Sequence, residues 1–438
     1  MSNTFNADRL TRLCDFLRQS PTPWHATSNI GARLEQAGFQ RLEEKANWQL
    51  KAGKRYYVTR NDSAIIAFQL PKSELTGLRM IGAHTDSPGL HIKPNATQRS
   101  AGWLQLGVQV YGGVMLAPWF DRDLGLAGRV HVRHADGRLE SVLLNVDRPI
   151  AMVPSLAIHL DRDVNNGRAL NPQTQMSPVL MQSDTAALPE LLLQWLKEQH
   201  GLNGVEIVDF ELGFYDVQPP SLVGVKRELV ASARLDNLLS CFIGLEALLE
   251  CDGSQGAVLV ANDHEEVGSA SACGAQGPFL ADVLKRINAQ LGRGSEKGSE
   301  ESLIQLVQSS LMISCDNAHA LHPNFREKHD EHHGPAINGG PVIKVNASQR
   351  YATNSVTGAL FRDVCREADV PVQSFVTRAD MGCGTTIGPI TATEIGIPTV
   401  DVGVPQWAMH SIRETAGTKD VEFLTRALTL FLNRASLN

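Results

Sequence analysis

The chain has no long hydrophobic segment. No stretch of its 438 residues approaches the roughly 18 consecutive apolar residues that a membrane-spanning helix needs. Residues 1–12 carry Asp8 and two arginines but no apolar core segment, so we expect neither a secretory signal nor a membrane anchor. These absences argue against a membrane protein and favour the cytoplasm.

Closely spaced cysteine pairs are missing as well. The seven cysteines are odd in number and scattered, and none forms a C-x-x-C motif. This pattern is typical of reduced thiols in a cytosolic protein, so we expect no disulfides. The seven are Cys14, Cys241, Cys251, Cys273, Cys315, Cys365 and Cys383.

An excess of positive charge is also absent. The formal net charge is -7, and there is no dense block of lysine and arginine. Such a chain repels nucleic acid and anionic lipid, so we expect neither as a partner. Hydrophobic content of 42% and charged content of 20% are close to the averages of globular proteins, which indicates a soluble fold.

The length of the chain exceeds the size at which one hydrophobic core stops growing, so two domains are expected. Apolar and polar residues alternate through Leu104–Val110 and again near Val130, before an Asp136-Gly137 turn, a pattern typical of β-hairpins. The Pro219-Pro220 pair closes this stretch. We therefore predict an inserted β-rich domain at 91–222 and a discontinuous domain formed by 1–90 and 223–438.

The discontinuous domain alternates helical patterns with short runs typical of buried strands. Residues Leu10 to Leu17 have apolar side chains at helical spacing, and Pro21 and Pro23 are expected to end that helix. Strands that alternate with helices indicate an α/β fold with a largely parallel sheet. A Gly-, Ser- and Glu-rich segment at 292–301 is expected to be a surface loop. The predicted strands are 79–83, 257–261, 311–314, 370–376 and 398–404.

Polar residues that can bind metal follow these strand runs, at the end where open α/β sheets place their ligand sites. Histidine nitrogen and carboxylate oxygen suit a catalytic zinc site, because closed thiolate sites leave no position for water. Two histidines and three carboxylates would suffice for two ions that share one bridging carboxylate. The candidate residues are His84, Asp86, Asp236, Glu265, Glu266, Asp316 and His410.

Two of these places suggest a division of roles. The adjacent side chains of Glu265 and Glu266 point differently, so one can ligate metal while the other moves a proton from water to the leaving amine. Asp86 follows His84 by two residues on an extended chain, so its carboxylate can hold the imidazole and fix the tautomer.

Single members also have plainer interpretations. Asp236 can cap the helix that follows it, Asp316 can close an Asx-turn, and His410 can be an ordinary buried histidine. The stretch His329–His333 has charged neighbours that favour a solvated loop at a pocket entrance over a metal tract. Gly382–Gly388 resembles a dinucleotide fingerprint, but isoleucine replaces its third glycine, so a backbone turn lining the site is favoured.

The ordered set of candidate residues resembles the aspartyl aminopeptidase family of dinuclear metallopeptidases, metallopeptidase family 18. The similarity runs through most of the chain, and strings this long are specific. The resemblance implies a zinc-exopeptidase-like fold: a mixed, mostly parallel sheet flanked by helices, with an inserted β-rich domain for dimerisation or as a lid. The matching strings are Ser20–His25, Gly82–Pro88, Asp263–Ser269, Gly340–Asn346 and Met409–Glu414.

The resemblance also implies a ligand set. One metal would be held by His84, Asp236 and Asp316. The second would be held by Asp236, Glu266 and His410, with Asp236 bridging. Glu265 would be the general base for a hydroxide that bridges the metals. The implied cofactor is two Zn²⁺ per subunit, and Mn²⁺ or Co²⁺ also suits this mixed nitrogen and oxygen set.

The implied activity is a cytosolic aminopeptidase that removes N-terminal residues, preferably Asp or Glu, from peptides with a free N-terminus. Four positions match the family's substrate contacts: His159, His319, Lys344 and Tyr351. A lysine near the pocket would pair with the carboxylate of an acidic substrate side chain. An ordinary surface lysine is the alternative for Lys344.

The family assembles as a tetrahedral dodecamer built from dimers, and the resemblance implies the same homo-oligomer here. His159 would be supplied across the dimer interface. Apolar residues alternate with it through Leu156–Leu160, which predicts an extended segment that leaves His159 on the opposite face. A purely structural histidine is the other interpretation.

Two other functions stay open. A dinuclear amidohydrolase or deacylase acting on N-acyl or C-terminal substrates would use the same metals. A catalytically idle scaffold on the same fold is a different class, because fold does not imply function. The retention of Glu265 and of every ligand position favours an enzyme.

Overall fold

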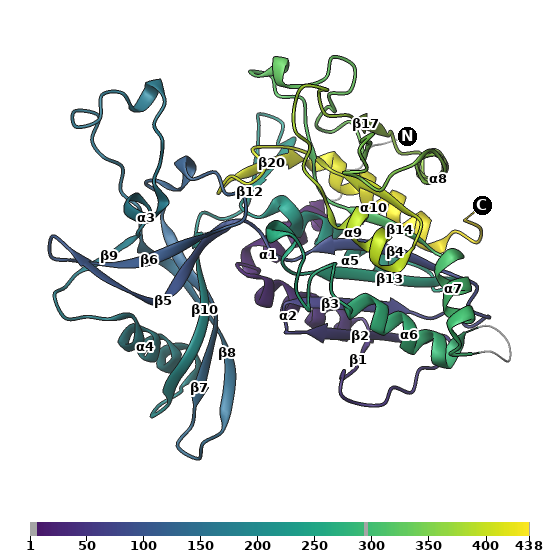
Figure 1. Cartoon of the computed structure of the whole chain (residues 1–438), viewed down its shortest axis with the longest axis horizontal. Helices are drawn as coiled ribbons and strands as arrows, with labels where there is room; N and C mark the ends of the chain where they lie inside the picture. The colour runs from purple at the N-terminus through teal and green to yellow at the C-terminus, as the bar shows by residue number, and fades with distance from the viewer. Residues whose placement is uncertain (1–6, 293–296, 438) are drawn as a thin grey trace. The chain divides into compact units, whose positions relative to one another are not determined.

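The computed structural model describes residues 7–292 and 297–437, which form two compact units (Figure 1). Unit 1 comprises Met1–Asp86, Pro220–Met409 and Glu414–Asn438, and unit 2 comprises Ser87–Pro219 and His410–Arg413. The short segment His410–Arg413 lies outside the predicted insertion at 91–222. It joins unit 2 because Met115 N donates to His410 O at 3.0 Å and Ile412 packs into that unit's core.

Unit 1 is built on a large mixed sheet. Among the described residues nine strands form it, in the order β1-β2-β3-β13-β4-β14-β18-β16-β17. The central strands β13, β4, β14 and β18 run parallel, while β3 and β16 pair antiparallel with their neighbours β13 and β18. The predicted α/β class with a mostly parallel mixed sheet is therefore confirmed. The strands are β1 (Gln40–Arg41), β2 (Arg55–Arg60), β3 (Ala64–Gln69), β4 (Leu78–His84), β13 (Gly256–Asn262), β14 (Leu311–Cys315), β16 (Val342–Lys344), β17 (Gln373–Phe375) and β18 (Thr399–Gly403).

Helices cover both faces of this sheet (Figure 1). Alternate residues of β13 point to opposite sides, so Leu259 enters one apolar core and Val260 enters the other. The first core contains residues of α1 (Ala7–Gln19), α2 (Pro23–Gln36), α5 (Leu235–Glu250), α8 (Ser355–Glu367) and α10 (Thr418–Asn433). The second contains residues of α6 (Phe279–Leu291), α7 (Glu300–Gln308) and α9 (Ile387–Ile395).

Two local predictions need correction. Pro23 does not simply end the first helix, because it is the first residue of α2, where its missing N–H costs nothing, and Thr22 is the N-cap. The predicted loop at 292–301 is described only in part, since 293–296 lie outside the described residues. Its last two positions, Glu300 and Glu301, belong to α7, which Ser299 caps through a bond from Ser302 N.

Unit 1 also contains a smaller sheet. It has the order β11-β12-β20-β19-β15. The strands are β11 (Ser221–Val223), β12 (Leu229–Ser232), β15 (Ala318–His319), β19 (Pro405–Trp407) and β20 (Glu414–Gly417).

Unit 2 is an antiparallel sheet with the helix α4 packed on its core. The described strands follow the order β8-β7-β10-β5-β6-β9, and each pairing is antiparallel. Leu192 and Trp195 of the helix α4 are buried in this core. The elements are β5 (Gly89–Ser100), β6 (Trp103–Tyr111), β7 (Leu124–Arg133), β8 (Leu139–Ala151), α3 (Pro172–Gln175), β9 (Val179–Gln182), α4 (Leu188–His200) and β10 (Glu206–Asp216).

Two further observations bear on the expectations from composition. All seven cysteines are free thiols, and five of them are buried. No helix in the described part of the chain combines the length and apolar character needed to cross a bilayer.

Candidate metal centre

His84 is the last residue of β4, at the carboxyl end of the main sheet, and its ring is almost fully buried. Its Nδ1 faces Asp86, 3.1 Å from the carbonyl oxygen and 3.3 Å from Oδ1. Its Nε2 faces three other carboxylates: Asp236 Oδ1 at 3.4 Å, Glu265 Oε2 at 3.8 Å and Asp316 Oδ1 at 3.8 Å. The ring therefore presents one nitrogen to an orienting carboxylate and the other to a group of potential ligands.

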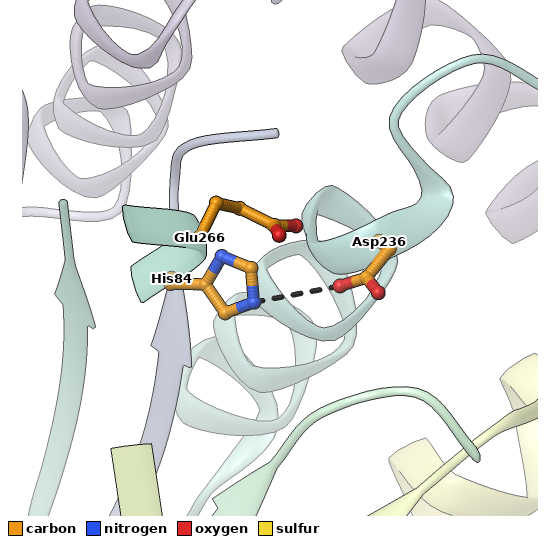
Figure 2. Close-up of side chains that lie close together, drawn as sticks. All are labelled: His84, Asp236 and Glu266. Atoms are coloured by element: carbon orange, nitrogen blue, oxygen red, sulfur yellow. Dashed lines mark ion pairs between the residues drawn. The ribbon is translucent and has the colours of Figure 1, made fainter. Parts of the chain in front are cut away.

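Asp236 lies in the first turn of α5, but its backbone is not helical there (φ −82°, ψ 109°). Arg234, in the left-handed region, is the N-cap and makes no side-chain cap bond. Asp236 N donates instead to Glu414 Oε2 at 2.8 Å. Asp236 is therefore not the helix cap that the plainer interpretation proposed, and its carboxylate points to His84 (Figure 2).

Glu265 and Glu266 open the 3₁₀ turn η3 (Glu265–Val267), which follows β13. His264 before the turn and Gly268 after it both have positive φ, so the chain bends sharply on each side. The Asp86 carboxylate accepts hydrogen bonds from Glu265 N and Glu266 N, each at 3.1 Å. Asp86 thus fixes the glutamate pair as well as the imidazole.

These side chains come from separate strand ends and meet at one place. Figure 2 shows His84 from β4, Asp236 from α5 and Glu266 from η3 around a shared centre. Two overlapping groups have possible ligand atoms within 4.8 Å of one another: His84 with Asp236 and Glu266, and His84 with Glu265 and Asp316. The groups share His84, whereas the resemblance implied that Asp236 is the shared residue.

The electrostatics of the cluster favour a bound cation. Burial raises the pKa of Glu265 to about 8, and the carboxylates of Asp316 and Asp236 add to the rise. The pKa of Glu266 is likewise raised by burial and by Asp236. Burial lowers the pKa of His84, but the surrounding carboxylates outweigh it and raise that pKa well above its usual value. Several acids packed this closely repel one another, and a divalent cation would offset that repulsion. A nitrogen and oxygen donor set of this kind fits zinc.

Lys344, the last residue of β16, is only 2% exposed, so it is not an ordinary surface lysine. Its Nζ donates to Asp316 Oδ2 at 3.3 Å and to Asn317 O at 3.2 Å. The ammonium also lies 5.1 Å from the centre of the Tyr351 ring. Lys344 therefore bonds a predicted metal ligand directly, and it also contacts the ring of Tyr351, another predicted substrate residue.

A cavity of about 300 Å³ lies beside these residues in unit 1. Tyr351 and His319 line it, and the His319 ring packs edge-on against Phe375 at 5.6 Å. The residues 382–384 form part of its wall, where the sequence predicted a backbone turn. His329 and Asp330 line it too, and His329 Nε2 accepts a bond from His322 N at 3.1 Å.

His159 and His410 are described within unit 2. The segment around His159 is a turn and not the extended strand that was predicted, because Leu160 N donates to Ala157 O at 2.9 Å. His159 and its apolar neighbours Ile158 and Leu160 are all exposed. His410 has its Nδ1 3.1 Å from Gly113 O. Its role as a ligand stays a prediction.

Glu414 is a residue of this centre whose role the sequence did not indicate. It begins β20, is almost fully buried, and holds the backbone of Asp236. The only available signal was its place at the end of the Met409–Glu414 string.

Comparison with known proteins identifies the family. The profile of the M18 family, described as aminopeptidase I zinc metalloprotease, matches residues 16–432. A probable M18 family aminopeptidase 2 of Pseudomonas putida (strain GB-1) is 54% identical over 432 residues, 98% of each chain. Ape4 in its cryo-EM complex with Nbr1 superposes with a TM-score of 0.93 at 38% identity, covering 99% of this chain and 87% of Ape4.

A dodecamer structure of mApe1 from S. cerevisiae superposes with a TM-score of 0.84 at 27% identity, covering 97% of this chain and 96% of mApe1. The resemblance inferred from the motifs is therefore confirmed along nearly the whole length of the chain. The buried cluster of imidazole and carboxylates at the sheet edge agrees with the description of that family as zinc metalloproteases. This chain belongs to the M18 family of zinc metallo-aminopeptidases.

Proposed function

We propose that this aminopeptidase uses two zinc ions to remove N-terminal residues, preferably Asp and Glu, from peptides. The observation that carries the proposal is the convergence of His84, Asp236, Glu265, Glu266 and Asp316 from four separate segments of the chain. No single pair of them would be informative, because short motifs of histidine and acid are common. Their meeting at the carboxyl edge of a parallel sheet is not expected by chance.

The proposed ligands are His84, Asp236 and Asp316 for one ion, and Asp236, Glu266 and His410 for the other. When bound, such ions polarise the scissile carbonyl and make a water nucleophilic near neutral pH. Asp86 orients the His84 ring, and its carboxylate also anchors Glu265 by accepting a hydrogen bond from the Glu265 backbone N–H.

Glu265 is the proposed general base. Its side chain belongs to the cluster, with Oε2 3.8 Å from His84 Nε2, but is partly exposed, and burial raises its pKa to about 8. A carboxylate whose pKa approaches neutrality can both take a proton from water and return it to the leaving amine.

Lys344 is proposed to set the preference for acidic residues. It is a buried cation that contacts both Asp316 of the ligand cluster and the ring of Tyr351, a proposed substrate residue. His319 and Tyr351 line the adjoining cavity and are proposed to contact the substrate with it.

A variant tests this preference. Lys344→Ala should reduce kcat/KM more for Asp- and Glu-initiated peptides than for Ala- or Leu-initiated ones, because only the acidic side chains lose a charge partner. The measurement is the ratio of kcat/KM for acidic substrates to kcat/KM for neutral ones, since the lost bond to Asp316 affects every substrate alike. An equal loss for both classes would remove Lys344 from specificity.

The test of the whole proposal combines metal content with substrate profiling. Elemental analysis of the purified protein should find two zinc ions per subunit, and Mn²⁺ or Co²⁺ should restore activity to protein stripped by a chelator. A panel of aminoacyl substrates should be led by Asp and Glu. Turnover of N-acylated substrates in place of free amines would instead identify a deacylase, and inactivity with every metal would identify an idle scaffold.

A homo-oligomer is also proposed, built from dimers into a tetrahedral dodecamer. Unit 2 exposes Leu156, Ile158 and Leu160 on one loop, and apolar side chains gathered in this way are typical of interfaces. The mApe1 of S. cerevisiae is a dodecamer by the name of its structure. In this arrangement His159 would reach the active site across the dimer interface. Free thiols at all seven cysteines favour the cytoplasm as the compartment.

A further inference from the structure

Asp401 is a buried carboxylate that the proposed chemistry does not use. It is the third residue of β18, directly beside β14, and its side chain has no exposure to solvent. Burial raises its pKa, while the nearby Lys344 ammonium acts in the opposite direction. A buried acid is costly unless its oxygens are well satisfied, so its partners indicate what it does.

Besides Ser314 of the neighbouring strand β14, the hydrogen-bond partners of Asp401 come from two separate loops. Its Oδ2 accepts a hydrogen bond from Ala352 N at 2.6 Å, and its Oδ1 accepts one from Thr386 Oγ1 at 2.6 Å. Its own N–H donates to Thr353 Oγ1 at 2.9 Å. One carboxylate therefore joins the loop 350–353 to the loop 382–386.

Both loops form walls of the 300 Å³ cavity. The first contributes Tyr351, and the second contributes Gly382, Cys383 and Gly384. Nearer the surface Arg350 also bonds the second loop, through Nε to Gly384 O at 3.4 Å and by accepting from Thr385 Oγ1 at 3.1 Å. Asp401 makes the buried part of this connection, through the amide of Ala352, the residue that follows Tyr351.

The site is shaped to admit a carboxylate. Thr386 is the N-cap of α9, so the Asp401 oxygens lie at the positive end of a helix. A Cβ built on Gly388 would overlap both Asp401 oxygens, so the glycine leaves the room that the carboxylate fills. A generic packing position would not need this combination of cap, glycine and acid.

We propose that Asp401 is a positioning residue for the aminopeptidase reaction, which holds Tyr351 and the 382–384 wall in the geometry that binds substrate. The inference rests on the proposed role of this cavity in substrate binding. Asp401 touches neither the substrate nor the ligand cluster in this arrangement, and it acts through the two loops. Its loss should therefore weaken substrate binding more than it slows the chemical step.

The test is a set of paired variants of the full-length protein, with kcat, KM, zinc content and Tm measured for each. Asp401→Ala should raise KM by about tenfold or more with kcat nearly unchanged, the result expected when binding is lost equally in the ground state and the transition state. Asp401→Asn should recover most of the KM, because its oxygen can accept from Ala352 N while its amide donates to Thr386 Oγ1. Zinc content should stay at the wild-type value in both.

Asp420 supplies a matched control. It too is a fully buried aspartate that joins a loop, accepting from Asn338 N at 2.6 Å and from Gly340 N at 2.8 Å, but the loop that it holds does not line the cavity. Asp420→Ala should lower Tm without moving KM. If Asp401→Ala behaves in the same way, Asp401 is a structural residue and the proposal is wrong.

A second pair keeps the test decisive if Asp401→Ala does not fold. Thr386→Val removes the hydroxyl that donates to Asp401 and also accepts from Gly388 N at the start of α9, and Thr386→Ser retains both bonds. Valine should raise KM and serine should not; equal KM values for the two would overturn the proposal. The kinetics use whichever aminoacyl substrate the wild type cleaves best, so a failure of the proposed acidic preference appears in the wild-type profile and leaves the comparison intact.

Discussion

At the scale of single residues, Glu265 and Glu266 show how neighbours can take different roles. The side chains belong to different ligand groups around His84, although one turn carries both and Asp86 accepts a bond from each amide. Glu265→Gln should keep the metal but lose at least about 100-fold in kcat, the usual contribution of a general base. Elemental analysis beside the kinetics is the measurement.

Glu266→Gln is the control for that variant, since it makes the same chemical change one residue away. It should lose zinc, because an amide is a weak replacement for an anionic ligand. Should Glu265→Gln be the variant that loses zinc, Glu265 would be a ligand, as its place in a group with His84 and Asp316 would allow.

Asp420 provides a prediction about pH. Burial raises its pKa from 3.8 to about 7, so the folded protein holds this proton more tightly than the unfolded chain does. The stability it contributes is therefore present in acid and is lost as pH rises from about 4 to about 7. Asp420→Asn cannot ionise, so its Tm should gain on that of the wild type across this range. The exposed Asp8→Asn is the control, and parallel Tm curves for Asp420→Asn and wild type would contradict the prediction.

At the scale of elements, the end of strand β18 needs a glycine, because it packs directly against the backbone that carries Asp316. Gly403 ends β18, and a Cβ there would overlap the carbonyl oxygen of Asp316 and the backbone of Asn317. Because no side-chain rotation relieves an overlap with backbone, Gly403→Ala should displace Asp316. Zinc affinity and kcat/KM should both fall, the latter by roughly 10-fold to 100-fold.

Gly358→Ala is the matched control within the same unit. Its Cβ would make only an ordinary contact with Thr353 Cγ2 at 3.6 Å, and alanine in the helix α8 should add up to about 1 kcal/mol of stability. Activity should not change. Wild-type zinc binding by Gly403→Ala would mean that the edge of the sheet adapts more easily than its packing indicates.

The elements that carry the site could be predicted from the sequence because buried parallel strands give continuous apolar runs. β4, β13, β14 and β18 were visible in this way, and the acids after them fall at a common sheet edge. β16 is too short, at three residues, to give a pattern, so the burial of Lys344 could not be foreseen. The alternation at Leu156–Leu160 suggested a strand, but apolar residues in an exposed turn give the same pattern.

At the scale of the whole molecule, the sequence indicated an insertion but not its full membership. Its strands could be recognised from local alternation, whereas His410–Arg413 joins unit 2 through contacts with residues about 300 positions earlier, such as Met115. The partners of Glu414 and Asp401 were hidden for the same reason. Local sequence patterns predict helices and strands, whereas the residues that hold a site together are identified by contacts between positions distant in the sequence.

The proposed assembly also makes a prediction at this scale. Leu160 is 75% exposed in the loop of unit 2, so Leu160→Asp should weaken an interface that buries it and shift the protein to smaller species in analytical ultracentrifugation. Leu139→Asp is the matched control, because Leu139 is 62% exposed at the start of β8, outside that loop. The same shift in both variants would show that the loop has no special part in assembly.

The sharpest test of a shared active site mixes two inactive proteins. If His159 reaches the site of a second subunit, a complete site needs Glu265 from one chain and His159 from another. Subunits with Glu265→Gln and subunits with His159→Ala, dissociated together and reassembled, should then show more activity than either variant alone, because an isologous dimer of the two contains one complete site. Mixing without dissociation is the control and should give no gain. A reassembled mixture no more active than the sum of its parts would place His159 in its own subunit's site or outside catalysis.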